Sequence, residues 1–460
     1  MRAFGAALAI AAAAAVGLIA PADGRAAYAF TSHTFTPCAA TGRTGPTLAQ
    51  CLTAYGSTAW ASDATKFNVS TGIQLWTVPS TGLYRVTAAG AKGGGAVGAA
   101  GRVVAANISL TEGDTIKILV GQLGASSGNT GGGGGGSFVA TNANAALVVA
   151  GGGGGGGNGA AGSTAPATTG TGVAGANSSG GGGGGFTGGG SGASGAAFTA
   201  GGAGGTGVNG GFGGGGAGAT SAGGGGGGGY SGGGGGANII SNSYGGGSGG
   251  LMYTAAGAAS VDSTGTNSAD GYVTIAAIAP AVATMTPRTA YATNPSSLVW
   301  DLTMNAPVTG ITASSFAVGG TSSGWFVNSV TGSGATYVVT LTSMFTPTAE
   351  GTVYPTLLAN AATDGGNRTG PGANTDGSPS TVDRTNPTAS SFTLSTISRT
   401  AATYSVTFSE TVTGLTTADF AASGGSTGWT VSSVAGSGAG PYTVTLANAT
   451  SGGAPAGTHI

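Results

Sequence analysis

The feature that most constrains this chain is a glycine-rich tract between about residues 131 and 250. Uninterrupted glycine blocks at 131–136, 151–157 and 223–229 alternate there with small residues. Glycine loses more backbone entropy on ordering than any other residue. The tract is therefore either a flexible linker or a segment that many close backbone contacts hold in order.

Three features favour an ordered tract. Serine is a minority partner of glycine, no charged residue occurs from 121 to 251, and aromatic residues interrupt the runs at Phe186, Phe198, Phe212, Tyr230 and Tyr244. A flexible linker has little use for such aromatic side chains. The ordered alternative is a bundle of polyproline-II-type helices made of glycine, because their backbone N–H and C=O groups point sideways toward neighbouring helices.

Short strand candidates lie on both sides of the tract. They cover 72–79, 83–88, 102–110, 115–120 and 146–150 before or within it, and 271–276 after it. The polar residues 111–114 predict a hairpin between the third and fourth strands. We therefore expect one β-domain over 30–279, with the glycine tract 125–250 inserted into it and anchored by its strands.

The motifs between the glycines occur in an order that resembles a known module. They are GPTLAQC (45–51), GIQLWTVP (72–79), ILVGQ (118–122), LVVA (147–150), GFGG (211–214) and GYVTI (271–275). This order is similar to that of the glycine-rich ectodomain module of the anaplastic lymphoma kinase and leukocyte tyrosine kinase family and its bacterial relatives. The resemblance, over about 35–278, implies a tumour-necrosis-factor-like β-sandwich with an inserted polyglycine-II bundle. No ligand-contacting residue can be matched.

A repeat begins after Pro280. The pattern from Val308 to Leu341 recurs from Val412 to Leu446, and its first landmarks are offset by 104 positions, which is the size of one β-sandwich. It resembles bacterial immunoglobulin-like repeats of surface adhesins. We expect repeat 1 over 280–385 and an incomplete repeat 2 over 386–460, because the second copy lacks the final strands of the first. The chain is then a fragment of a longer protein or a truncated reading frame. The predicted fold class is all-β throughout.

The N-terminus has the pattern of a secretory signal peptide, with Arg2, an apolar run over 4–20 and small residues after it. Cleavage sites of the A-x-A type end at Ala22 and Ala29, and we place the signal over 1–29. An uncleaved anchor helix is the alternative. Cys38 and Cys51 are the only cysteines, so outside the cytoplasm they are expected to form one disulfide; two free thiols are the alternative.

Composition limits the chemistry. The 460 residues include only 12 Lys and Arg, 13 Asp and Glu and 2 His, with a net charge of −1, so we expect no nucleic-acid partner and no catalytic site. The mature chain has no candidate for membrane insertion. Calcium is the one cofactor considered, with Asp364, Asp383 and Glu410 near the junction of the repeats as candidate ligands. Solvated surface acids are the favoured alternative, so no metal is predicted.

These features predict a non-catalytic bacterial protein, secreted or at the cell surface and adhesin-like, in which the repeats form a stalk that presents the glycine-rich module. Its partner is expected to be a host or cell-surface protein or glycan. A receptor-like module for a specific protein or glycan is the alternative, and Phe212 and Tyr230 either contact that ligand or plug the bundle. Ice binding by a flat polyglycine bundle is a further alternative. The ligand-binding residues stay unknown.

Overall fold

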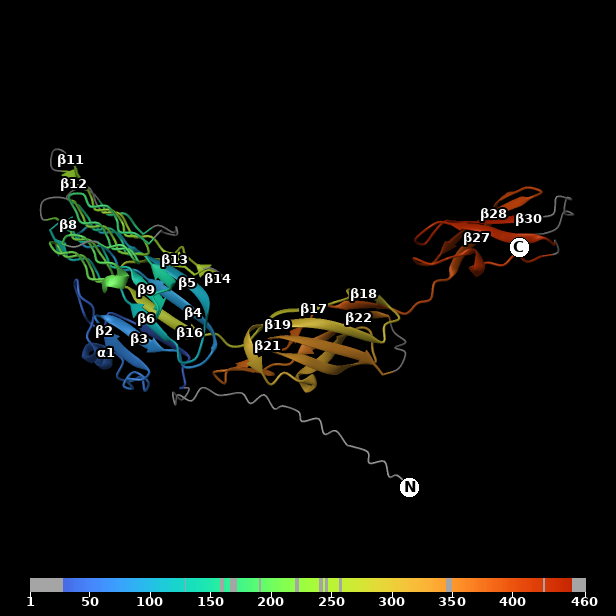
Figure 1. Ribbon diagram of the computed structural model, residues 1–460, viewed down its shortest axis with the longest axis horizontal. Helices are drawn as coiled ribbons and strands as arrows, with labels where there is room; N and C mark the ends of the chain where they lie inside the picture. Colours follow the sequence, from blue (N-terminus) through green and yellow to red (C-terminus); the bar gives the residue numbers. More distant parts are fainter. Residues whose placement is uncertain are drawn as a thin grey trace, which may run out of the picture.

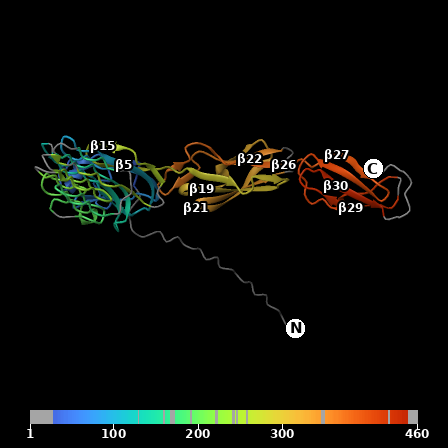
Figure 2. The same cartoon turned by 90° about the horizontal axis from the view of Figure 1, so that it is seen from above.

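The computed structural model describes residues 28–448 apart from 129, 158–160, 166–171, 190–191, 220–222, 240–242, 245–246, 256–258, 345–349 and 425–426. Three β-rich units follow one another in a row, with the glycine-rich module at one end and repeat 2 at the other (Figures 1 and 2). The fold class is all-β, as the alternating runs predict. The predicted signal peptide falls mostly outside the described residues.

Two six-stranded sheets form the sandwich of the glycine-rich module. The first has the order β1 (Ser32–Phe35), β16 (Tyr272–Ala277), β4 (Gly82–Ala89), β5 (Gly101–Leu110) and β14 (Ala259–Asp262), with β15 (Thr266–Asn267) also on β5. The second has the order β13 (Tyr253–Thr254), β10 (Ala146–Ala150), β9 (Ser137–Thr141), β6 (Thr115–Leu119), β3 (Ile73–Thr77) and β2 (Phe67–Ser70). Strand β16, which follows the glycine tract, lies between β1 and β4, so the tract is an insertion into one sandwich.

The predicted hairpin over 102–120 is wrong. Strand β5 pairs with β4 in the first sheet and β6 pairs with β3 in the second, so residues 111–114 cross from one sheet to the other. The crossing is held by Val78, which donates to the Asp114 carbonyl at 2.8 Å and accepts from the Gly113 N–H at 3.0 Å. A short polar turn between two alternating strands fits both connections, so alternation alone does not distinguish them.

The core between the two sheets combines aromatic and aliphatic side chains. Phe35, Phe67, Trp76 and Tyr84 are almost completely buried in it. The other side of the second sheet carries a separate cluster. Phe138 of β9 packs there against Phe186 and Phe198 of the glycine runs, and Phe212 belongs to the same cluster. These aromatic residues therefore fill the space between the bundle and the sheet, and they anchor the bundle there.

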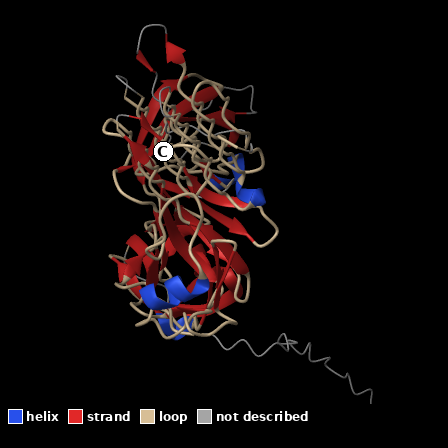
Figure 3. Cartoon of the chain, turned by 90° about the vertical axis from the view of Figure 1, so that its left-hand side faces the viewer, coloured by secondary structure: helices blue, strands red, loops and turns tan. Residues whose placement is uncertain are grey.

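The glycine tract is a bundle of extended runs (Figure 1) that are mostly neither helix nor strand (Figure 3), and backbone hydrogen bonds connect the runs. The N–H groups of residues 131–136 donate in turn to the carbonyl oxygens of Gly156, Ala125, Gly216, Gly153, Gln122 and Gly213 at 2.8–3.0 Å. Positions three apart thus bond to the same neighbouring run, and each run has neighbours on three sides. This three-residue period is that of a polyglycine-II helix. Small elements border the bundle: β7 (Ser126–Ser127), β8 (Thr130–Gly131), η1 (Phe198–Ala200), β11 (Asn238–Ile239) and β12 (Ser243–Tyr244).

Repeat 1 is a two-sheet sandwich. One sheet contains β17 (Val282–Pro287), β19 (Ser297–Thr309), β21 (Trp325–Ser343), β23 (Ala362–Asp364) and β24 (Thr369–Gly370). The other contains β18 (Tyr291–Thr293), β26 (Ser380–Asp383), β22 (Gly351–Leu357), β20 (Phe316–Gly320) and β25 (Thr375–Asp376), and η2 (Ala313–Ser315) precedes β20. Trp300, Leu302, Val339 and Leu341 lie at its centre.

Repeat 2 forms one four-stranded sheet in the described residues. The order is β27 (Ala389–Ile397), β28 (Ala401–Phe408), β30 (Tyr442–Asn448) and β29 (Trp429–Ala435), with η3 (Thr417–Asp419) beside it. The two repeats also share an equivalent side-chain hydrogen bond. The Tyr337 hydroxyl donates to the Val308 carbonyl at 2.8 Å, and the Tyr442 hydroxyl donates to the Val412 carbonyl at 2.8 Å.

Candidate ligand-binding surface

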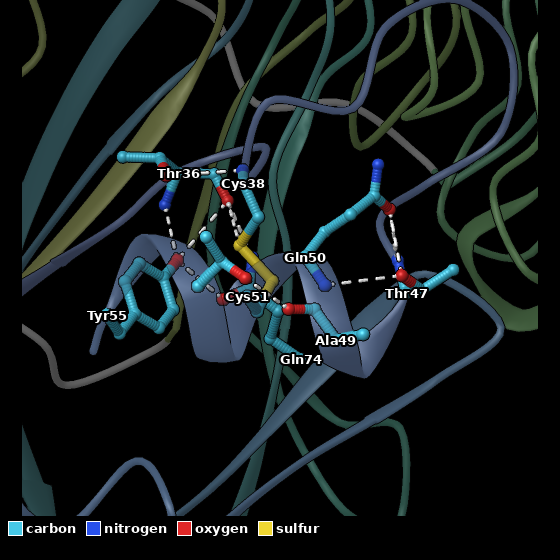
Figure 4. Close-up of a disulfide and its surroundings, with 9 residues drawn as sticks. Thr36, Cys38, Thr47, Ala49, Gln50, Cys51, Tyr55 and Gln74 are labelled. Atoms are coloured by element: carbon cyan, nitrogen blue, oxygen red, sulfur yellow. Dashed lines mark hydrogen bonds between the residues drawn. A yellow bond between two sulfur atoms is a disulfide. The ribbon is translucent and has the colours of Figure 1, made fainter.

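The predicted disulfide is present. Cys38 and Cys51 are bonded and almost fully buried, and they join the first loop of the module to helix α1 (Leu48–Ala54) (Figure 4). Thr47 caps this helix, since its hydroxyl accepts from the Gln50 N–H while Gln50 Oε1 accepts from the Thr47 N–H. A capping box of this kind satisfies two backbone donors that the first turn leaves free.

A buried polar network attaches the same loop to the second sheet. The Tyr55 hydroxyl accepts from the Thr36 N–H at 2.8 Å and donates to Gln74 Oε1 at 2.8 Å, and Gln74 Nε2 donates to the Thr36 carbonyl at 2.8 Å (Figure 4). Gln74 is fully buried. Both the oxygen and the nitrogen of the Gln74 amide are hydrogen-bonded to the loop, and these bonds fix the position of the loop on the sheet.

The disulfide loop also contacts the glycine bundle. Arg43 and Gly204 exchange backbone and side-chain hydrogen bonds at 2.8 and 3.0 Å, and Phe212 N–H donates to the Gly42 carbonyl at 2.8 Å. A Cβ atom at Gly45 would lie 2.5 Å from the Phe212 ring, and one at Gly72 would lie 2.8 Å from it. Gly45, Gly72 and Phe212 come from three of the motifs that carry the family resemblance, so three distant motifs meet at one place.

Two neighbouring cavities lie along this seam between the loop, the second sheet and the bundle. We call them together the seam groove. The larger cavity has about 580 Å³ and the smaller about 230 Å³, and Thr71 and Gly201 line both. The first is lined by Thr44, Gly45, Pro46, Thr47, Leu48, Val69, Thr71, Gly72, Ala200, Gly201, Ala203 and Phe212. The second is lined by Ser70, Thr71, Ile73, Leu75, Lys117, Asn142, Asn144, Phe198, Thr199 and Gly201.

The chemistry of the seam groove is polar and nearly uncharged. Lys117 is the one charged residue in its lining, and its ammonium donates to Asn144 Oδ1 at 2.8 Å. Hydroxyl and amide groups alternate there with aliphatic surface. The lining holds no pair of a nucleophile and a base, so the groove can bind a molecule but offers no group to transform it. An uncharged ligand with both polar and apolar faces suits it.

The calcium candidates separate into two places. Asp364 is the last residue of β23. Its carboxylate accepts from the backbone N–H groups of Gly366 and Arg368 and pairs with the Arg368 guanidinium at 2.7 Å. An arginine therefore already balances its charge. Asp364 does not join Asp383 and Glu410.

Asp383 and Glu410 do lie together at the junction of the repeats. They line one cavity of about 550 Å³ with Glu350 and Tyr291, and the Tyr291 hydroxyl donates to Asp383. That hydrogen bond and the Thr385 N–H lower the pKa of Asp383, whereas partial desolvation and the neighbouring Asp383 carboxylate raise the pKa of Glu410. Within the described part of the chain, no group of three or more His, Cys, Asp and Glu side chains is arranged to hold a metal ion.

Sequence reasoning missed the seam groove as a site, although its motifs were visible. Thr71 and Gly72 both have positive φ, 49° and 81°, and form the two-residue turn between β2 and β3 that borders the groove. The strand pattern around 67–76 could have predicted this turn. The approach of Thr199 and Asn142 from distant segments could not be predicted, because it depends on how the bundle lies on the sheet.

Comparison with known proteins finds similarity over a local stretch of the chain. A stretch of 95 residues is 41% identical to the leukocyte tyrosine kinase receptor of Mus musculus, and it covers 20% of this chain and 11% of that receptor. No protein-family model matches the chain. In the described residues no helix is long and apolar enough to cross a membrane. The similarity to part of a receptor and the buried disulfide are consistent with an extracellular module.

Proposed function

We propose that this chain is an exported, adhesin-like bacterial surface protein. The immunoglobulin-like repeats form its stalk, and the glycine-rich module at the end of the row binds a ligand in the seam groove. The observation that carries the proposal is the groove itself. Its walls are fixed by a disulfide, a buried amide network and a hydrogen-bonded bundle, so it is formed before any ligand arrives. Preorganised walls reduce the entropy cost of binding.

The ligand that the groove suits is an uncharged segment of a cell-surface glycan or protein. Hydroxyl and amide groups such as those of Ser70, Thr71 and Asn142 exchange hydrogen bonds with sugar hydroxyls or peptide groups, while Leu48 and Val69 contact apolar faces. A strongly charged partner has no counterpart in this lining. The calculated net charge of −1 for the whole chain agrees with recognition that depends little on salt.

A receptor-like role is the second candidate, in which the module binds one specific protein. The local similarity to the leukocyte tyrosine kinase receptor favours it. The two candidates differ in the partner that the groove selects: a range of surface glycans for an adhesin, and a single protein for a receptor-like module.

The test is binding of the whole chain to arrayed glycans and extracellular proteins, with Thr44→Arg as the groove variant. Thr44 is exposed and lines the larger cavity, so an arginine there would fill the groove with a charged side chain. We expect at least a tenfold loss of binding for this variant. Thr393→Arg is the matched control, because Thr393 is an exposed threonine on β27 of repeat 2.

Binding of Thr44→Arg at the wild-type level would exclude the groove as the binding site. Absence of any bound glycan or protein for the wild-type chain would leave the module with a structural role alone. Surface display is tested separately, by detecting the protein on intact cells of its source with an antibody to the module. A protein found only in the culture medium would count against the stalk arrangement.

A further inference from the structure

A single turn of repeat 1 closes over the glycine-rich module. This turn, residues 364–368, connects β23 to β24, and we call it the Arg368 turn. The Asp364 side chain is fully buried and the Arg368 side chain is 16% exposed, and the two form an ion pair at 2.7 Å. Asp364 also accepts from two backbone N–H groups within the turn, at 2.9 and 3.0 Å. The carboxylate thus fixes both the turn and the direction of the arginine.

The Arg368 guanidinium crosses to the module. It lies over the ring of Tyr84 on β4, 5.2 Å from the ring centroid. Tyr84 is fully buried, and its hydroxyl donates to the Ser80 carbonyl at 2.7 Å. A residue of repeat 1 therefore covers a core aromatic residue of the module. Cation–π contacts of this kind are stronger when the cation is shielded from water.

At the same place, a glycine of each unit lies close to a side chain of the other unit. A Cβ atom at Gly82 would lie 2.3 Å from Arg368 Nη2, and a Cβ atom at Gly366 would lie 2.5 Å from Ser80 Oγ. Real Cβ atoms do not reach such distances, so a larger residue at either position would displace the facing side chain, Arg368 or Ser80. The contact therefore contains a glycine from each unit, Gly82 of the module and Gly366 of repeat 1.

The connection between the two units is short and is hydrogen-bonded at both ends. Only residues 278–281 separate β16 of the module from β17 of repeat 1. The Ile278 N–H donates to the Leu83 carbonyl at 2.9 Å, and the Ala281 N–H donates to Asn305 Oδ1 at 2.9 Å. Asn305 Nδ2 in turn donates to the Ala279 carbonyl at 3.1 Å. Each end of the connection is thus bonded to a strand of a different unit.

We infer that the glycine-rich module and repeat 1 form one cooperative and rigid body, locked by Arg368 and Asp364 against Tyr84. Repeat 1 completes the cover of the module core, and the orientation of the module on the row of repeats is fixed. The Arg368 guanidinium balances the charge of the Asp364 carboxylate, so no metal ion is needed for that purpose. The inference is independent of what the seam groove binds.

Calorimetry of the whole chain, with hydrogen exchange of peptides from β4 and β19, tests the lock. In the wild-type chain we expect the module and repeat 1 to unfold in one shared transition. Arg368→Ala should divide it into two, with the module unfolding at the lower temperature. Arg288→Ala is the matched control, because Arg288 forms an exposed ion pair with Asp301 in the same repeat at 2.7 Å. It should leave the shared transition intact.

Two further variants separate loss of the lock from misfolding of the Arg368 turn. Gly82→Ala adds a methyl group on the module side that displaces the Arg368 guanidinium but removes neither charge of the Asp364–Arg368 pair, and we expect it to divide the transition as well. The double variant Asp364→Asn, Arg368→Leu leaves no unpaired buried charge in repeat 1, and it should behave in the same way. Separate transitions in the wild-type chain, or one shared transition in both Arg368→Ala and Gly82→Ala, would overturn the inference.

Discussion

A glycine of the bundle is best described by what a Cβ atom would meet at its position. At Gly133 it would lie 2.0 Å from the carbonyl oxygen of Gly226, in the middle of the bundle. At Gly234, in the same tract, the nearest atom would be the carbonyl oxygen of Ala176 at 3.7 Å, an ordinary contact. The tract therefore contains both obligatory glycines and replaceable ones.

This difference gives a paired prediction. Gly133→Ala forces two backbones apart, and we expect it to lower the free energy of unfolding of the module by about 1–3 kcal/mol, as overpacking does in other cores. Gly234→Ala should leave stability within about 1 kcal/mol of wild type, since alanine restricts the unfolded chain and meets no obstacle. Urea unfolding followed by circular dichroism measures both. Equal effects would mean that the runs are not packed against one another.

His33 lies among aromatic rings near the start of the module. The rings of Phe35, Tyr55 and Trp60 have centroids 4.6–4.9 Å from its own, at nearly right angles. Its Nε2 is buried and has no hydrogen-bond partner among the described residues. Burial lowers the pKa of His33 from 6.5 to about 4, because the charged ring would lose its water.

The pKa of His33 predicts acid sensitivity. The unfolded chain binds a proton at this histidine below about pH 6.5 and the folded chain only near pH 4, so the stability due to a neutral His33 is complete above pH 6.5 and is lost as the pH falls toward 4. We expect the melting temperature of the module to fall over this range. His33→Phe should flatten the dependence, and an unchanged slope in that variant would assign it to the carboxylates.

At the scale of elements, the two repeats use different residues for the same cap. Ser315 in η2 and Asp419 in η3 each accept from the N–H of the threonine three positions earlier, Thr312 at 3.0 Å and Thr416 at 2.7 Å. Hydrogen bonds from the backbone N–H and from the side-chain hydroxyl of Thr416 lower the pKa of Asp419. The acid at 419 is therefore a capping residue, and its absence from repeat 1 does not break the repeat.

The carboxylates at the junction of the repeats allow a further prediction. Desolvation and Asp383 raise the pKa of Glu410, so the stability that this group contributes is present at low pH and is lost as the pH rises through its folded-state pKa. At neutral pH we expect Glu410→Gln to raise the melting temperature slightly by removing repulsion. Glu112→Gln, at an exposed turn, is the control and should have no effect.

Calcium distinguishes the two interpretations of these carboxylates. With solvated acids, added calcium or a chelator leaves the melting curves of the wild-type chain and of Glu410→Gln unchanged. A calcium-dependent rise in melting temperature that is present in the wild type and absent from the variant would show that Asp383 and Glu410 hold the ion.

At the scale of the whole molecule, the structure bears on where the mature chain begins. The Tyr28 hydroxyl donates to the Thr77 carbonyl at 2.6 Å, its ring lies 6.1 Å from that of Trp60, and the Lys66 ammonium lies over it at 5.2 Å. Tyr28 thus packs as part of the module. Cleavage after Ala29 would remove it, whereas cleavage after Ala22 would retain it.

We therefore expect the secreted protein to begin at Asp23, and not at Phe30 as the signal boundary over 1–29 predicts. N-terminal sequencing of the exported protein measures this directly. A chain that begins at Phe30 would show that the contacts of Tyr28 are dispensable, and its module should then be as stable as one that retains Tyr28. A chain that begins at Met1 would indicate an uncleaved anchor.

Much of the architecture follows from local patterns. The β-strands at 72–79, 83–88 and 146–150, the disulfide of Cys38 and Cys51, the insertion of the glycine tract and its three-residue period can all be predicted, because each depends on neighbouring residues or on the steric freedom of glycine. The internal repeat is equally local, since its landmarks recur at a constant offset.

Only the tertiary structure decided which sheet each strand joins and which distant residues meet. Residues 111–114 have the composition of a hairpin turn but cross between sheets. Gly45, Gly72 and Phe212 form one wall of the seam groove, and Arg368 of repeat 1 reaches Tyr84 of the module. The physical reason is common to all three. Alternation and glycine content specify local conformation and burial, whereas contacts between distant segments depend on how complete layers pack against each other.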